Sequence, residues 1–117
     1  MNRVQRGFAA EKCVEDYFLG KGLQVIQRRY WSKRAEIDLI VKDIEASLLL
    51  FVEVRSTTKN LSEPLLSISR KKIRSMHYAM LSFLQQYPVY MNYNYRLDLV
   101  VVKDLLVREH IENIFFD

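Results

Sequence analysis

The most constraining feature of this sequence is a pair of short apolar runs that each contain a carboxylate. The runs cover Ala35–Val41 and Leu48–Arg55, and the polar segment KDIEAS at 42–47 joins them. Two such runs around a polar turn are typical of a β-hairpin. Asp38 lies inside the first run and Glu53 near the end of the second, where a buried strand normally excludes charge. We therefore expect a fold built on a sheet, in which the two carboxylates need a compensating partner.

Side-chain alternation decides which residues share a face of this hairpin. Pairing the runs about the centre of the turn puts three pairs opposite each other on one face: Asp38 and Glu53, Glu36 and Arg55, and Ile40 and Phe51. A neighbouring register would still bring the two carboxylates close together. Like charges opposite each other destabilise a sheet, so a raised pKa, a nearby cation or a bound metal must compensate. Carboxylate oxygens suit Mg²⁺ or Mn²⁺ better than Zn²⁺.

The remaining pattern predicts a mixed sheet flanked by helices, an α/β fold in one domain over residues 1–117. The expected elements are a helix over Arg6–Leu19, strands over Leu23–Tyr30 and Tyr95–Val102, a loop at 56–64, a helix over Ser69–Tyr87 and a short closing element at 110–116. Helical spacing of apolar residues supports both helices. The order helix, three strands, helix, strand predicts an antiparallel meander and then a crossover to a parallel strand.

Charge and composition restrict the partners. The net charge is +4, residues 1–34 hold eight Lys and Arg against three Asp and Glu, and SRKKIR at 69–74 adds four positive charges. A surface that binds phosphate and an ordinary solvated surface both fit this distribution. The candidates for nucleic-acid contact are Arg28, Arg29, Arg70, Lys71, Lys72 and Arg74. No apolar run approaches the roughly 18 residues that span a membrane, and the charged N-terminus predicts a cytoplasmic protein.

A third carboxylate extends the acidic group. Glu11 lies along the apolar stripe of the first helix, beside Phe8 and Val14, instead of on its solvated face. Each carboxylate alone is best explained by a structural ion pair. Glu11, Asp38 and Glu53 together with two basic residues, Arg55 and Lys72, instead favour a site that holds a divalent cation and a phosphate.

The blocks RGFAAE, AEIDLI, FVEVRS, SISRKKI and YRLDLVVV resemble, in order and spacing, the YraN-like family of small bacterial proteins. The resemblance runs from Gly7 to about Phe115. It implies a compact restriction-endonuclease-like or Holliday-junction-resolvase-like core with an Asp … Glu-X-Lys signature. By this resemblance, Asp38 and Glu53 are the ligands of Mg²⁺ or Mn²⁺, Glu11 is the helix glutamate of the acidic cluster, and Lys72 is the basic residue that begins the second long helix.

Two positions depart from the family pattern. Ala35 stands where the family usually has glycine, which removes a flexible backbone position at a strand entry. Arg55 stands where the signature has lysine. An arginine supplies positive charge and a bidentate grip on phosphate, but it cannot act as a base at neutral pH. We therefore expect Lys72 to supply the missing ammonium, provided that the start of its helix borders the site.

The function expected from these features is nucleic-acid binding, with metal-dependent endonuclease activity on structured or branched DNA. Two alternatives remain: a nucleic-acid-binding module with a decayed active site, for which Arg55 is the main argument, and a protein–protein adaptor with structural ion pairs. The run YPVYMNYNY at 87–95 could stack on unpaired bases, cover a sheet edge or form a homodimer contact. His77 and His110 fit no metal-ligand spacing and are interpreted as surface or packing residues.

Overall fold

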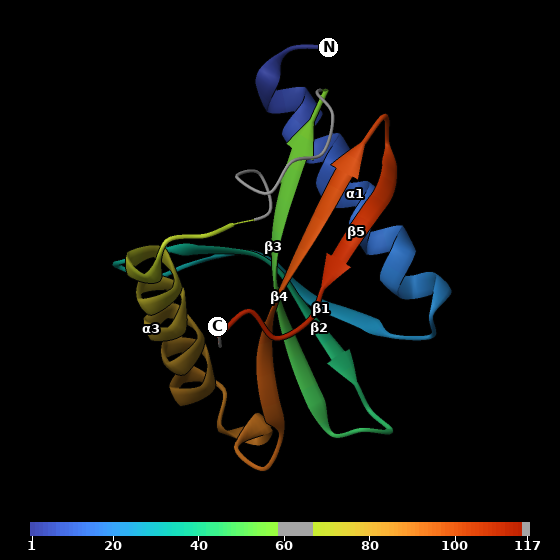
Figure 1. Cartoon of the computed structure of the whole chain (residues 1–117). Coiled ribbons are helices and arrows are strands. Elements are labelled where there is room, and N and C mark those ends of the chain that lie inside the picture. The colour runs from blue at the N-terminus through green and yellow to red at the C-terminus, as the bar shows by residue number, and fades with distance from the viewer. Residues whose placement is uncertain (59–66, 116–117) are drawn as a thin grey trace.

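The computed structural model describes residues 1–58 and 67–115. Its elements, in chain order, are α1 (Arg3–Gly20), β1 (Gln24–Trp31), β2 (Glu36–Asp43), β3 (Leu48–Thr57), α3 (Arg70–Gln86), the 3₁₀ turn η1 (Pro88–Tyr90), β4 (Asn94–Lys103) and β5 (Leu106–Ile111) (Figure 1). Most of the loop expected at 56–64 lies outside the described residues, as does the end of the closing element expected at 110–116. The described helices and the first four strands agree closely with the ranges expected from the sequence.

The five strands form one mixed sheet in the order β1-β2-β3-β4-β5. The first three strands are an antiparallel meander, and β4 runs parallel to β3, as predicted. The predicted register of the β2–β3 hairpin is confirmed, because the ladder pairs Ile40 with Phe51 and extends from Asp43–Leu48 to Leu39–Val52. The α/β fold class is therefore confirmed, and the architecture is consistent with a nuclease-like core.

One strand was not in the predicted order. β5 pairs antiparallel with β4 through a tight turn in which Asp104 and Leu105 both have positive φ angles, 53° and 57°. Two consecutive residues of this conformation are the requirement of a type I′ hairpin turn. β5 is an edge strand and most of its side chains are exposed or only partly buried, so it lacks the apolar run by which a buried strand is recognised.

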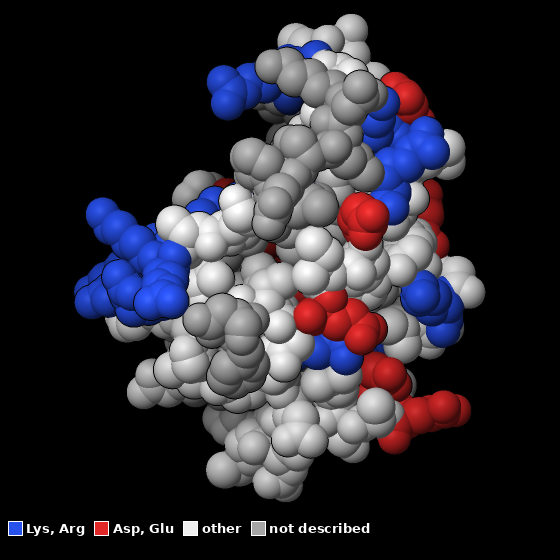
Figure 2. Space-filling model, viewed as in Figure 1, with Lys and Arg blue, Asp and Glu red and all other residues white. Residues whose placement is uncertain are grey.

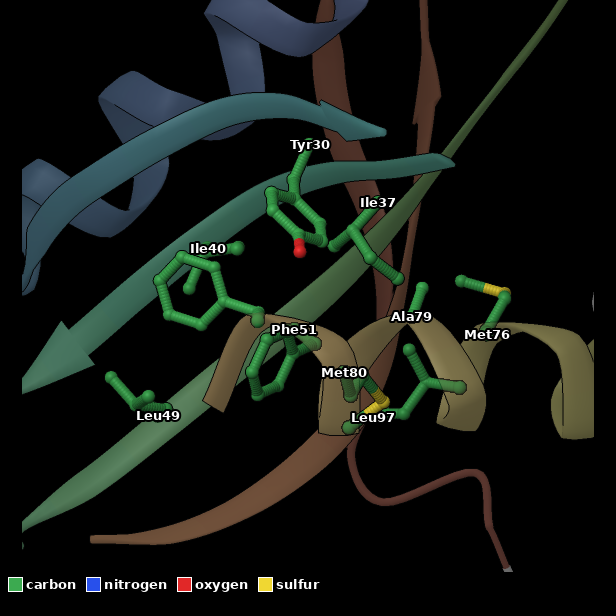
Figure 3. Close-up of a cluster of buried hydrophobic side chains, with 10 residues drawn as sticks. Tyr30, Ile37, Ile40, Leu49, Phe51, Met76, Ala79, Met80 and Leu97 are labelled. Atoms are coloured by element: carbon green, nitrogen blue, oxygen red, sulfur yellow. The ribbon is translucent and has the colours of Figure 1, made fainter. Parts of the chain in front are cut away.

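Each face of the sheet is covered by one helix (Figure 1). The α1 face buries a cluster made of Ala10, Val14, Phe18, Leu39, Val41, Leu50, Val52, Val100 and Val102. The α3 face buries a second cluster, which includes Ile40, Phe51, Met76, Met80, Phe83 and Leu97 (Figure 3). Alternation in the hairpin explains the division, since Val41 and Val52 join the first cluster and their neighbours Ile40 and Phe51 the second.

The tyrosine-rich segment after α3 contributes to packing. Tyr90, Tyr93 and Tyr95 all pack against the cluster under α3. The ammonium of Lys42 lies 5.5 Å and 5.8 Å from the ring centroids of Tyr90 and Tyr93. These three rings therefore contribute to the core under α3, and the base-stacking, sheet-edge and homodimer interpretations stay predictions. No helix of residues 1–58 or 67–115 is long and apolar enough to cross a membrane.

Candidate acidic site

Asp38 and Glu53 come together where the β2–β3 ladder ends. The last ladder pair is Leu39–Val52, so both carboxylates lie one residue beyond it. The Asp38 side chain then takes the place of a ladder acceptor, because its Oδ2 accepts a hydrogen bond of 2.7 Å from the Val54 amide. This bond fixes Asp38 against β3.

Lys72 closes the site from the first turn of α3. The hydroxyl of Ser69, the residue before the helix, accepts a 3.1 Å hydrogen bond from the Lys72 amide, as expected for an N-cap. The cap fixes where the helix begins, and the Lys72 Nζ lies 3.0 Å from Glu53 Oε2. Glu53 is buried while about half of the Lys72 side chain is exposed. The start of α3 therefore borders the carboxylates, which is the condition set for Lys72 by the sequence.

The surroundings of Asp38 and Glu53 disfavour a negative charge on both carboxyl groups at once. Burial, followed by the charge of Glu53 and a hydrogen bond with its side chain, raises the pKa of Asp38 to about 8, although the Val54 amide acts in the opposite direction. Burial and the charge of Glu11 also raise the pKa of Glu36. At neutral pH, and without a cation, Asp38 therefore holds a proton that an exposed aspartic acid would have released.

A pocket of about 390 Å³ opens over these groups, and we call it the acidic pocket. It is lined by Arg34, Ala35, Glu36, Asp38, Glu53, Ser69, Lys71, Lys72 and Ser75. Acidic side chains come from the β2–β3 hairpin and lysines from the start of α3. One wall can therefore hold a cation while the other attracts an anion such as a phosphodiester.

Glu11 lies beside the acidic pocket and not in it. Its carboxylate forms a 2.6 Å ion pair with Arg29 and lines a separate hollow on the α1 side. Its charge still contributes to the raised pKa values of Asp38 and Glu36. The structure thus brings two of the three predicted acidic residues into one pocket and leaves the third as an electrostatic neighbour.

Arg28 and Arg29, predicted to contact nucleic acid, both pair with carboxylates of α1. Arg28 grips the buried Glu15 with two hydrogen bonds of 2.8 Å and 2.5 Å, and this contact lowers the pKa of Glu15. Because these guanidiniums already have acidic partners, their positive charge is largely compensated within the protein.

The other predicted basic residues lie around the start of α3. Arg55 donates a 2.7 Å hydrogen bond to the carbonyl of Ser67, just before that helix. Lys71 lines the acidic pocket, Arg70 is exposed, and Arg74 lines a neighbouring hollow. Figure 2 shows Lys and Arg side chains gathered over this end of α3, at the left of the view.

Sequence reasoning missed two charged residues of the pocket, Glu36 and Arg34. Glu36 was placed on the same face as Asp38, and that alternation was the signal for its presence. Arg34 precedes β2, and its guanidinium lies over the Tyr78 ring of α3, 4.6 Å from the centroid. This contact depends on the packing of α3 and has no signature in the local sequence.

A second polar cluster, between β4 and β5, was also missed. Asp98 is buried and receives hydrogen bonds from Arg96 and the Asn113 amide. The His110 ring lies 2.7 Å from Asp98 Oδ2 and 2.8 Å from the Tyr17 hydroxyl. Burial acts to raise the pKa of Asp98, but the contacts with His110 and Arg96 outweigh it and the pKa is lowered.

This cluster has the residue types of a metal site, but its carboxylates are already engaged in ion pairs. Asp98, His110 and Glu112 lie close enough together to hold an ion. However, the Arg96 guanidinium already forms ion pairs with both carboxylates. A guanidinium that already pairs with both carboxylates leaves a cation little to gain. We interpret the group as a structural network, in which His110 is a packing residue, as the sequence indicated.

The fold and the acidic pocket together indicate the class of protein to which this chain is similar. A mixed sheet between two helices carries paired carboxylates at the end of a central hairpin and a lysine from the following helix. This arrangement is consistent with nuclease-like cores, and it agrees with the YraN-like resemblance found in the sequence.

The particular family follows from comparison with known proteins. The model of Uncharacterised protein family UPF0102 matches residues 10–102, and the chain belongs to this family. A UPF0102 protein of Thermodesulfovibrio yellowstonii is 31% identical over 121 residues, covering 99% of this chain and 100% of that protein. One from Clostridioides difficile strain 630 is 31% identical, with coverages of 98% and 100%. One from Pseudomonas putida strain GB-1 is 35% identical, with coverages of 86% and 80%.

Proposed function

We propose that this protein is a metal-dependent phosphodiesterase that cleaves nucleic acid, with structured or branched DNA as its substrate. The observation that carries the proposal is the acid pair in the acidic pocket, in which the pKa of Asp38 is raised to about 8 beside the buried Glu53. A buried carboxyl pair that retains a proton at neutral pH is a site where a divalent cation can replace that proton.

The donor set suits Mg²⁺ or Mn²⁺. Asp38 and Glu53 offer carboxylate oxygens, and ions of this kind are commonly bound by one or two carboxylates with the rest of the shell supplied by water and phosphate. Once Asp38 has lost its proton, Lys72 offsets only one of the two negative charges. A divalent ion held by these residues would polarise a phosphate oxygen and lower the pKa of a bound water.

The chain's own cations have separate roles in this proposal. The Lys72 ammonium, 3.0 Å from Glu53, lies where it can stabilise negative charge that develops on the phosphate. Lys71 and Arg34 line the same pocket and attract the nucleic-acid backbone without reading its sequence. Arg55 is bound to the carbonyl of Ser67, so we assign the role of the signature lysine to Lys72 instead.

Cleavage of a labelled four-way junction with Mn²⁺ at low salt tests the proposal. We expect wild-type cleavage that EDTA abolishes, and a loss of at least about 100-fold in Asp38→Asn and Lys72→Ala, typical of removing charge stabilisation at a reacting centre. Lys71→Ala is the matched control for Lys72, because it removes a lysine from the same helical turn that has no carboxylate partner among residues 1–58 and 67–115. It should weaken substrate binding more than the rate at saturating substrate.

The main alternative is a nucleic-acid-binding protein without catalysis, and the arginine at position 55 favours it. Metal binding without cleavage of any tested junction, duplex or single strand would support this alternative. Activity that is unchanged in Lys72→Ala would remove the assignment of Lys72. Absence of metal binding would leave the carboxylates as structural ion pairs, as in the adaptor interpretation.

A further inference from the structure

Another hollow lies on the opposite face of β3 from the acidic pocket. Arg3 and Arg6 of α1 form one side of it, and Ser56, Thr57 and Thr58 at the end of β3 form the other. Its volume is about 490 Å³. We call this hollow the basic groove.

The two arginines of the basic groove differ from the four arginines that pair with carboxylates in the described residues. They are one helical turn apart and therefore lie on the same side of α1, and both are exposed. Neither guanidinium is ion-paired with a carboxylate within residues 1–58 and 67–115, whereas Arg28, Arg29, Arg96 and Arg108 all are. The first turn of α1 also contains no acidic residue. The groove therefore has net positive charge with no internal compensation in the described chain.

The opposite wall supplies hydroxyl groups. Two of its residues are threonines and one is serine: Ser56 and Thr57 end the strand that carries Glu53, and Thr58 follows it. Guanidinium groups facing hydroxyls are the usual protein groups that contact phosphate oxygens of a nucleic-acid backbone. They fix the position of a strand without reading its bases.

The basic groove and the acidic pocket share the same stretch of β3. Val54 lines the groove, while its amide donates the 2.7 Å hydrogen bond to Asp38. The preceding residue, Glu53, points into the acidic pocket. The two sites therefore lie on either side of the C-terminal end of β3. Figure 2 shows basic side chains near the N-terminal end of α1, at the top of the view.

We propose that the basic groove is a second phosphate-binding site, which holds the backbone of the same nucleic acid at a phosphate away from the one in the acidic pocket. This inference rests on the proposed function, because it takes nucleic acid as the ligand. Contacts at two phosphates would fix the direction in which the strand enters the acidic pocket.

The salt dependence of DNA binding tests the groove. Binding to a labelled duplex is measured in EDTA, so that no cleavage occurs, over a range of NaCl concentrations for wild type, Arg3→Gln/Arg6→Gln and Arg6→Gln. Each lost phosphate contact lowers the slope of log K against log salt by about 0.9. We expect a decrease of about 0.9 in the single variant and about 1.8 in the double variant. The capping box of α1 uses Asn2 and Gln5 and is unchanged in these variants.

Lys21→Gln is the charge control. Lys21 is the C-cap of the 18-residue helix α1 and so lies at its other end, about 27 Å from Arg3. It should leave the slope unchanged. A second arm adds inorganic phosphate at constant ionic strength. We expect no displacement of DNA beyond the effect of the salt, because a polynucleotide makes several contacts and a free phosphate one.

The outcomes separate the two proposals. Wild-type binding with a slope that the double variant does not change would overturn the groove alone and leave the proposed function standing. Specific displacement by inorganic phosphate in wild type but not in the double variant would identify a free-anion site and overturn the groove as a nucleic-acid site. No salt-dependent binding by wild type would overturn both.

Discussion

Asp38 keeps its proton at neutral pH because burial and the charge of Glu53 both oppose its ionisation. The hydrogen bond from the Val54 amide favours the anion but does not offset them. Asp38 therefore lowers the free energy of unfolding when no cation is bound, and the size of this effect depends on pH.

We predict that Asp38→Asn changes how the free energy of unfolding depends on pH in the absence of metal. Folded Asp38 holds its proton up to about pH 8, whereas an unfolded aspartic acid releases it near pH 3.9. Between these values the folded state binds more protons, so the contribution of Asp38 to stability is lost as pH rises. Asn does not titrate, so the variant should gain stability relative to wild type between about pH 5 and pH 8. Urea denaturation in EDTA at both pH values measures the difference.

Glu45→Gln is the control for this experiment, since Glu45 is an exposed acid in the turn of the same hairpin. The difference in free energy of unfolding between Glu45→Gln and wild type should be the same at about pH 5 and pH 8. A constant difference between Asp38→Asn and wild type would show that Asp38 ionises normally in the folded chain.

At the scale of elements, the β4–β5 hairpin depends on one buried network. Arg96 pairs with the buried Asp98 and with Glu112, most of which is exposed. We predict that Asp98→Asn lowers the free energy of unfolding by about 3 kcal/mol, because it leaves Arg96 without its buried partner. Glu112→Gln is the matched control on the same arginine and should cost less than about 1 kcal/mol.

The pH dependence of this network has the opposite sign to that of Asp38. The pKa of Asp98 is lowered in the fold, so its contribution is present above the unfolded pKa and is lost as pH falls through the folded value. The difference between wild type and Asp98→Asn should therefore shrink below about pH 4. Chemical denaturation at neutral and acidic pH checks this, and a cost of Asp98→Asn that is the same at both pH values would contradict it.

The elements that the sequence predicted are those with strong periodic patterns. The hairpin register followed from alternation, and the position of Lys72 followed from the Ser69 cap. β5 was missed because an exposed edge strand has little apolar signal, and the contact of His110 with Asp98 depends on that strand. Glu11 pairs with Arg29 instead of joining the predicted cluster, and Arg29 has a φ of 48° on β1. Such a local backbone conformation cannot be read from residue type.

At the scale of the whole molecule, β3 organises the proposed chemistry. Its C-terminal half presents Glu53 to the α3 side and Val54 to the α1 side, so the acidic pocket and the basic groove lie on opposite faces of one strand. β1 and β5 are the edges of the sheet. A homodimer that addresses a symmetric junction stays a prediction.

The most direct test of the central claim is calorimetric titration of Mn²⁺ into wild type and Asp38→Asn at pH 7. The titration is repeated in buffers of different ionisation enthalpy, which reports the protons released. We predict that wild type binds the ion and releases close to one proton, because the ion replaces the proton held by Asp38. Asp38→Asn should bind far more weakly and release none. Equal binding by the two proteins, or no binding by wild type, would contradict the metal site.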